Sequence, residues 1–189
     1  NELINERFKD HLSVTSKTLI ECQNQIIEVA NALTETFKSG KKILICGNGG
    51  SAADAQHFAA ELVSSFSKEI KRRGLPAIAL TTDTSILTAF SNDLGFEGVF
   101  ARQVNALGSD GDCLVALSTS GNSKNCLLAI EEAKSKKMKA ISFLGQGGKM
   151  KNQSDYSICI PSSNTQNIQE MHIIAYHIIS ELIENNLFK

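Results

Sequence analysis

Residues 43–61, ILICGNGGSAADAQHFAAE, constrain the fold more than any other part of the chain. The four apolar residues 43–46 predict a short strand that is buried on both faces of a parallel sheet. A glycine-rich turn follows, and Ser51 opens an alanine-rich helix with Asp54 as its capping-box partner. The N–H groups of such a turn and the positive end of the helix dipole together stabilise an anion without a basic side chain. The stretch therefore predicts a phosphate-binding loop.

The helix that follows this loop contains two residues with chemically reactive side chains. His57 and Glu61 lie four apart, so their side chains project from one helix face, a short reach from the anion site. A dinucleotide fingerprint fits less well, because the glycine spacing differs and the basic residues 71–73 stand where an acidic residue is expected. The lysine of a Walker loop is absent too. The alternative is an ordinary tight connection that binds nothing.

A second dense polar loop, STSGNS, covers residues 118–123. It lies just past an apolar strand and just before a helix that starts near Lys124, so its four hydroxyl groups and its glycine suit an anion. Ser/Thr loops also occur as linkers, but a linker is uncommon between a buried strand and a helix N-terminus. Two such loops in one sheet indicate a phosphorylated ligand.

Apolar runs alternate with helical segments along the chain, which is typical of an α/β fold with a parallel sheet. The expected strands are residues 43–46, 75–81, 113–117, 139–144 and 156–160. The expected helices cover residues 1–38, 96–107 and 166–185, and others begin near residues 51, 84 and 124. The length of 189 residues and the 42% hydrophobic content fit one globular domain, residues 1–189.

The first helix is unusually apolar. Leucine or isoleucine recurs every seven residues at positions 12, 19, 26 and 33, which is close to a heptad seam. Further apolar residues widen this surface beyond what packing on one sheet face needs. Contact with another subunit and packing on the chain's own core are both consistent with this pattern.

Several polar residues have both a functional and an ordinary interpretation. Asn92 and Asp93 suit sugar hydroxyls, yet this pair also occurs in plain turns. The basic residues 68 and 71–73 fit a solvated loop or helix end better than an anion clamp. A lone histidine on a helix, such as His177, usually forms a structural hydrogen bond.

Composition excludes several functions. The formal net charge is −1 and no basic stripe interleaves with aromatic residues, so we expect no nucleic-acid partner and no membrane partner. No apolar run reaches the roughly 18 residues of a membrane span, and no signal peptide is evident, so we expect a cytoplasmic protein. The five scattered cysteines predict buried thiols rather than disulfides or a zinc knuckle.

Five pieces of the chain carry a specific resemblance: CGNGGSAADAQHFAAEL, LPAIALTTDTS, SNDLGFEGVFARQV, LSTSGNSKN and IQEMHIIAYHII. Together they resemble a sugar isomerase (SIS) domain and, within that superfamily, the phosphoheptose isomerase family. Generic SIS domains share the Ser/Thr loop but lack the His-x-x-x-Glu helix and the Ile-Gln-Glu-x-His ending. The resemblance implies a three-layer αβα sandwich of flavodoxin-like type with a five-stranded parallel sheet. It also implies a homotetramer with sites between subunits, residues 1–39 serving packing and oligomerisation.

The resemblance assigns roles to particular residues. Those implied to bind the substrate are Asn48, Gly49, Gly50, Ser51, Glu61, Asn92, Asp93, Ser118, Thr119, Ser120, Ser123 and Gln169. Those implied to hold one zinc ion per subunit are His57, Glu61, Gln169 and His177. The family usually has an acidic residue and an arginine where this chain has Gln166 and Asn167, so any role of charge at these two positions stays open.

The implied reaction turns sedoheptulose 7-phosphate, a phosphorylated seven-carbon sugar, into the aldose D-glycero-D-manno-heptose 7-phosphate for lipopolysaccharide or capsule. Such an isomerisation needs a base at C1 and C2, for which Glu61 is the candidate, and a group that moves protons between O1 and O2, for which His177 is the candidate. A carboxylate bound tightly to zinc is a poorer base, so a catalytic and a structural metal both stay open. The alternatives are a non-catalytic SIS protein that binds a replication initiator and an isomerase of another phosphosugar.

Overall fold

The computed structural model describes all residues 1–189. Five parallel strands form one sheet in the order β2-β1-β3-β4-β5. The strands are β1 (Ile43–Gly47), β2 (Ala77–Ala79), β3 (Cys113–Ser118), β4 (Lys139–Leu144) and β5 (Tyr156–Cys159). β2 is shorter than the predicted 75–81. It begins after Pro76, which has no N–H to donate to the sheet, and it ends at a turn formed by Leu80 and Thr81. The predicted α/β fold with a five-stranded parallel sheet is confirmed.

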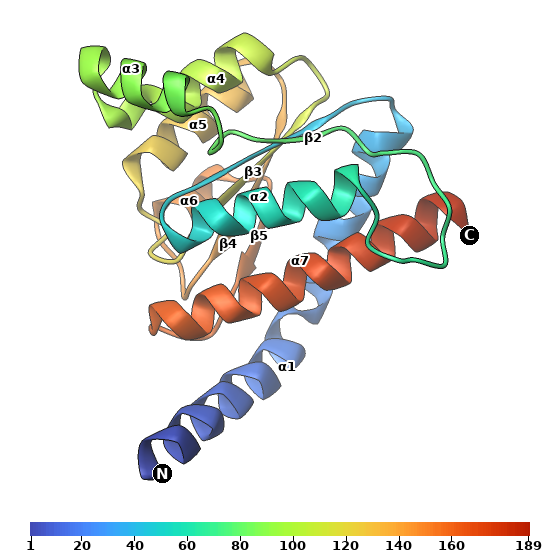
Figure 1. Ribbon diagram of the computed structural model, residues 1–189, viewed down its shortest axis with the longest axis vertical. Coiled ribbons are helices and arrows are strands. Elements are labelled where there is room, and N and C mark those ends of the chain that lie inside the picture. The colour runs from blue at the N-terminus through green and yellow to red at the C-terminus, as the bar shows by residue number, and fades with distance from the viewer.

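Helices cover both faces of the sheet (Figure 1). The helices are α1 (Glu2–Lys38), α2 (Gly50–Val63), α3 (Thr84–Leu94), α4 (Val99–Leu107), α5 (Lys124–Ser135), α6 (Lys149–Gln153) and α7 (Thr165–Phe188). Alternate residues of β3 show the layers, because Val115 belongs to the apolar core under α1, α2 and α7 and Leu114 to the core under α4 and α5. The three-layer sandwich is therefore confirmed.

Two segments differ from the expected helices. Residues 96–107 do not form one helix, because the 3-10 turn Phe96–Gly98 precedes α4. The short helix α6 was not among the expected helices, and the backbone N–H of Met150 donates to the carbonyl of Gly121. No helix is both long and apolar enough to cross a membrane.

The strand order places a ligand crevice beside β1. β1 pairs with β2 on one side and with β3 on the other, so the connections diverge between β1 and β3. In open α/β sheets such a switch point forms a crevice at the carboxyl ends of the strands. Gly47 at the end of β1 lies in register with Leu117 of β3, so the two polar loops leave the sheet side by side.

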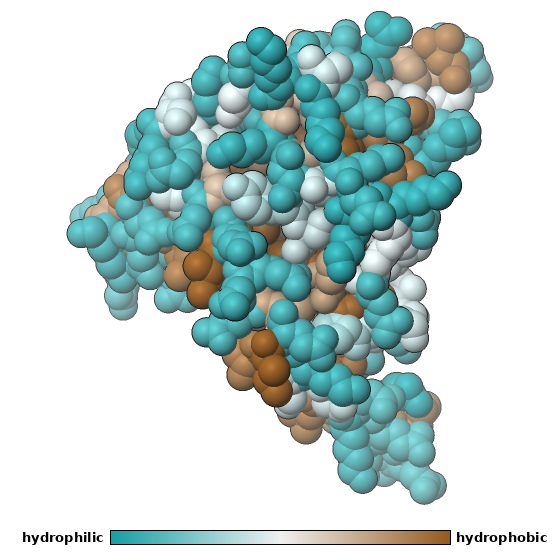
Figure 2. Space-filling model, turned by 180° about the vertical axis from the view of Figure 1, so that it is seen from behind, coloured by the Kyte–Doolittle hydropathy of each residue, from teal (hydrophilic) through white to brown (hydrophobic).

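Only part of the long helix α1 packs on the core of its own chain. Ile26 and Leu33 of the heptad seam are buried against the sheet, whereas Leu12 and Leu19 remain 67% and 66% exposed. The N-terminal end of the helix projects beyond the body of the molecule (Figure 1). On the other side of the molecule, apolar side chains are exposed next to this projecting end (Figure 2). Packing on the chain's own core therefore explains only the C-terminal half of the seam.

Candidate active site

The loops after β1 and β3 and the start of α7 enclose a polar pocket of about 300 Å³. Its lining is Asn48, Gly49, Gly50, Ser51, Leu117, Ser118, Thr119, Ser120, Ser123, Thr165 and Gln169. The two loops predicted to bind an anion therefore share one site with Gln169. No basic side chain lines it, so an anion there would be held by hydroxyl groups, backbone N–H groups and helix dipoles.

Helix α2 begins one residue earlier than predicted, and the predicted capping box is wrong. Gly49 is the N-cap residue with a φ of +57°, a conformation that glycine adopts at little cost, and no side chain caps the helix. A Cβ atom on Gly50 would lie 2.5 Å from the Gln169 side-chain nitrogen, so the missing side chain lets Gln169 pack on the helix start. Asp54 is only 6% exposed, and burial raises its pKa to about 6 against the opposing effect of His57.

The hydroxyl groups of the second loop face one another. The Ser118 Oγ lies 2.9 Å from the Ser123 Oγ and 3.4 Å from the Ser120 Oγ. Ser123 is the N-cap residue of α5, but its side chain makes no capping hydrogen bond. The loop thus presents a cluster of small donors at a helix N-terminus, which suits a phosphate group.

A pair of amides joins the two loops. The Asn48 Nδ2 donates to the Asn125 Oδ1 at 2.9 Å, and the Asn125 Nδ2 donates back to the Asn48 Oδ1 at 2.8 Å. Asn125 is buried in the first turn of α5 and was not predicted to belong to the site. Its position two residues after the serine loop was the only signal of this role in the sequence.

Three potential metal ligands lie together on α2 and α7. The His57 Nε2 is 3.0 Å from the Glu61 Oε1 and 3.5 Å from the His177 Nε2. One donor atom from each of the three residues lies within 4.8 Å of the others. The structure therefore brings three of the four predicted ligands into one cluster, while Gln169 lies against Gly50 in the polar pocket.

Tyr176 supports this cluster and was missed in the sequence. Its hydroxyl group lies 2.8 Å from the His57 Nδ1, and its buried ring stacks on Phe58. A bond at Nδ1 leaves the His57 Nε2 directed at Glu61 and His177. Burial and the neighbouring His57 lower the pKa of His177, against the opposing effect of Glu61, which favours a neutral imidazole.

Other predicted residues lie elsewhere. Asn92 and Asp93 are exposed in the last turn of α3, where the Asn92 Nδ2 donates to the Asp93 Oδ1 at 2.8 Å. Neither lines the polar pocket of the same chain. Gln166 is exposed and Asn167 is buried in the first turn of α7. The prediction of a wholly solvated basic loop is wrong for Arg72, whose side chain is buried in an ion pair.

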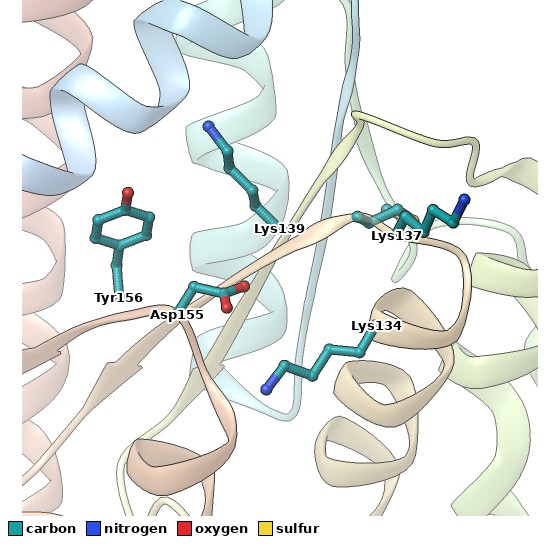
Figure 3. A pocket seen from close by; sticks show the side chains of 6 residues that line it. Lys134, Lys137, Lys139, Asp155 and Tyr156 are labelled. Carbon is teal, nitrogen blue, oxygen red and sulfur yellow. The ribbon is translucent and has the colours of Figure 1, made fainter.

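A larger cavity at the opposite end of the sheet lacks the features of a site. It lies at the starts of β4 and β5 and includes Lys134, Lys137 and Lys139 (Figure 3). The three ammonium groups point in different directions, and the nearby Asp155 carboxylate accepts the backbone N–H of Ala140 at 2.8 Å. These lysines therefore do not converge on one anion.

Comparison with known proteins identifies the family. A model of the SIS domain matches residues 7–145. The phosphoheptose isomerase of Roseiflexus sp. (strain RS-1) is 50% identical over 185 residues, which cover 97% of this chain and 93% of that protein. The chain belongs to the phosphoheptose isomerase family.

A second member of the phosphoheptose isomerase family, from Helicobacter pylori (strain P12), is 51% identical over 98% of this chain and 96% of its own length. The structure of the phosphoheptose isomerase from Francisella tularensis superimposes with a TM-score of 0.93 at 39% identity and covers 97% of each chain. The resemblance inferred from the sequence is thus confirmed over nearly the whole chain.

Proposed function

We propose that the protein interconverts sedoheptulose 7-phosphate and D-glycero-D-manno-heptose 7-phosphate. The observation that carries this proposal is the polar pocket at the β1 and β3 ends, adjoined along α2 and α7 by His57, Glu61 and His177. Membership of the phosphoheptose isomerase family supports the same reaction. It would supply a precursor of nucleotide-activated heptose, and we place it in the cytoplasm, where sugar phosphates are made and used.

The spacing along α2 suits a substrate with its phosphate at one end. At a rise of 1.5 Å per residue, Ser51 and His57 are separated by about 9 Å along the helix axis. A phosphate held by Ser51 and the serine loop would place the far end of an extended sugar chain near the His57 and Glu61 turn. The carbonyl carbon and C1 of a 2-ketose lie at that far end.

We infer that Glu61 is the base and His177 the group that moves protons between the two oxygens. Glu61 takes a proton from C1 as O2 gains one, which gives a cis-enediol. It then returns a proton to C2 while O1 loses one and C1 becomes the aldehyde carbon. A neutral His177 can both donate and accept a proton, in line with its lowered pKa.

We propose one zinc ion per subunit, held by His57, Glu61 and His177. Gln169, the expected fourth ligand, lies against Gly50 in this chain and would have to move to reach that ion. Two imidazole nitrogens and one carboxylate oxygen match the donor types of zinc sites, and the 3.5 Å between the two nitrogens is close to the edge of a tetrahedron with bonds of about 2.0–2.1 Å. When bound, zinc supplies a Lewis acid for the substrate carbonyl. Elemental analysis of protein purified without chelator should find about one zinc per chain, and the variant His57→Ala should lose it.

We propose a homotetramer with sites between subunits. A groove of about 360 Å³ between α1 and α7 is lined mainly by apolar side chains, among them Leu19, Ile27, Ile174 and Ile178. Such a groove, continued by the exposed apolar side chains of the projecting α1, suits helices of a second copy. Asn92 and Asp93 would then have to reach the site of a neighbouring subunit if they contact substrate.

The decisive experiment is to incubate the purified protein with sedoheptulose 7-phosphate and to follow the products by NMR. We expect an aldoheptose phosphate and, at equilibrium, both sugars. Ribulose 5-phosphate and fructose 6-phosphate serve as competing substrates. Faster turnover of either would reassign the protein to another phosphosugar, and no turnover of any would contradict an enzymatic role.

A further inference from the structure

Arg72 forms a buried junction at the end of helix α2. Its Nε donates to the Glu184 Oε1 at 2.6 Å, its Nη2 donates to the Glu61 carbonyl at 2.8 Å, and its Nη1 donates to the Leu62 carbonyl at 2.8 Å. The side chains of Arg72 and Glu184 are 0% and 1% exposed. One guanidinium group thus joins the last turn of α2, which carries Glu61, to α7.

Glu184 holds the loop that follows α2. Its two carboxylate oxygens accept the backbone N–H groups of Phe66 and Ser67, each at 2.9 Å. Burial by itself raises the pKa of Glu184, but the hydrogen bonds from Arg72 and these two N–H groups outweigh it and hold this pKa below its ordinary value. The carboxylate is therefore charged at neutral pH, and both of its oxygens accept hydrogen bonds.

The loop in turn contacts the second candidate catalytic residue. The Phe66 ring lies 5.7 Å from the His177 ring between centroids, with the planes tilted by 45°. His177 also packs edge to face on Tyr176, so two aromatic rings contact its imidazole. Both Glu61 and His177 therefore depend on the same buried pair, one through the backbone and one through the loop.

We propose that Arg72 and Glu184 are positioning residues that fix Glu61 and His177 relative to each other. This inference rests on the proposed function, because it concerns the placement of the base and the proton-transfer group of that reaction. The planar guanidinium group donates to two carbonyls at the end of the helix and to a carboxylate at the same time, in a fixed arrangement of its N–H groups. The ammonium group of lysine cannot reproduce this arrangement. Loss of these hydrogen bonds would let the end of α2 and the loop move independently of α7. Misplacement by about 1 Å of catalytic groups can cost about 100-fold in rate.

The test compares Arg72→Lys and Glu184→Gln with a matched control at a buried carboxylate that bonds neither α2 nor α7. Asp112 is also a buried carboxylate that accepts two backbone N–H groups, those of Lys42 and Ser109, and pairs with the Lys42 ammonium group. Asp112→Asn therefore removes an equivalent buried charge beside the starts of β1 and β3. Each variant is assayed for kcat, for KM and for zinc affinity by competition with a chromophoric chelator.

We expect Arg72→Lys and Glu184→Gln to lower kcat by about 100-fold with little change in KM, because the phosphate-binding loops are untouched. Their zinc affinity should fall by about 10- to 100-fold, as for other losses of support around metal ligands. Asp112→Asn should lower thermal stability as much or more and leave kcat and zinc affinity near parental values.

Phe66→Leu keeps the proposal testable if the buried variants do not fold. Phe66 is partly exposed, so this change leaves the ion pair and the fold intact while it removes the ring from His177. We expect a lower kcat at an unchanged KM. Parental kcat and zinc affinity in all folded variants would overturn the proposal. If the parent protein did not turn over heptose phosphate at all, the proposed function would fail, while zinc affinity would still report separately on the positioning of the ligands.

Discussion

The hydroxyl group of Tyr176 lies 2.8 Å from the Nδ1 of His57, and this contact determines which nitrogen of His57 faces the ligand cluster. Histidine ligands of metals commonly bond a partner through the second ring nitrogen, which fixes the tautomer and the ring orientation. The phenol provides this partner here from inside the core, since Tyr176 is fully buried.

Replacing Tyr176 by phenylalanine tests this support. The ring and its stacking on Phe58 remain, but the hydrogen bond to His57 is lost, so we expect zinc affinity to fall by about 10- to 100-fold. Titration of metal-free protein with zinc measures the change. Tyr156→Phe is the matched control, because Tyr156 is the other tyrosine and lies at the opposite end of the sheet. Equal zinc affinity in both variants would remove Tyr176 from the site.

Glu61→Gln separates catalysis from binding. The amide keeps the shape of the side chain but has no basic oxygen, so kcat should fall by about 100- to 10,000-fold while the phosphate-binding loops still hold substrate. Steady-state kinetics and substrate titration measure the two effects. Glu181→Gln, an exposed change one turn beyond His177 on α7, should have no effect. Near-parental turnover by Glu61→Gln would require another base.

Ser120→Ala should affect binding rather than turnover. Its hydroxyl group belongs to the serine cluster and would hold the phosphate equally in the ground state and the transition state. Hydrogen bonds to charged groups contribute about 1.5–3 kcal/mol, so we expect KM to rise by about 10- to 100-fold with kcat little changed. Ser135→Ala at the end of α5 is the control. A fall in kcat at constant KM would assign Ser120 to the chemical step instead.

His172 should make stability depend on pH. Burial lowers its pKa to about 4 against the opposing hydrogen bond to the Leu144 carbonyl, whereas the unfolded chain takes up a proton near pH 6.5. Its contribution is therefore complete above about pH 6.5 and is lost as the pH falls toward 4, a change on the order of 3 kcal/mol.

Urea unfolding of metal-free protein between pH 7 and pH 4 measures this dependence. His172→Gln keeps a donor for the Leu144 carbonyl but does not titrate, so its profile should be flatter than that of the parent. Comparison with the parent cancels the opposite effect of Asp54, whose raised pKa stabilises the fold as the pH falls through about 6. Parallel profiles would show that His172 is protonated in the folded state as readily as in the unfolded chain.

Leu19→Glu should break the proposed assembly. Leu19 lines the apolar groove between α1 and α7 and is 66% exposed in the single chain, so a charge there harms an interface without harming the fold. Light scattering should give about four chain masses for the parent and fewer for the variant. Leu107→Glu on α4 is the control on the other face of the sheet, and a stable, active parental monomer would contradict the tetramer.

Sequence patterns predict the sheet and both polar loops because their signals are local. Apolar runs mark strands, and loops rich in glycine or serine before helices mark anion sites wherever the chain goes afterwards. The same reasoning fails for Arg72. Its basic neighbours indicate a solvent-exposed loop. Nothing in the local sequence shows that Glu184, 112 residues later, lies against the same loop. Tyr176 and Asn125 were missed for the same reason, since each acts on a side chain of another element.

The capping box failed for a different reason. Ser51 and Asp54 have the right spacing, but glycine at position 49 can adopt a positive φ and start the helix earlier. Asp54 then lies within the helix rather than at its first turn and becomes buried. Short motifs thus predict that a helix begins, but flexible residues beside them decide where.

The reciprocal amide pair of Asn48 and Asn125 has a thermodynamic consequence. Because both amides are already satisfied by each other, the two loops are held in register before any ligand arrives. A preorganised site loses little conformational freedom on binding, so more of the interaction energy appears as affinity. Calorimetry with inorganic phosphate should therefore show a small change in heat capacity, as expected when a rigid polar cradle fills without ordering new chain.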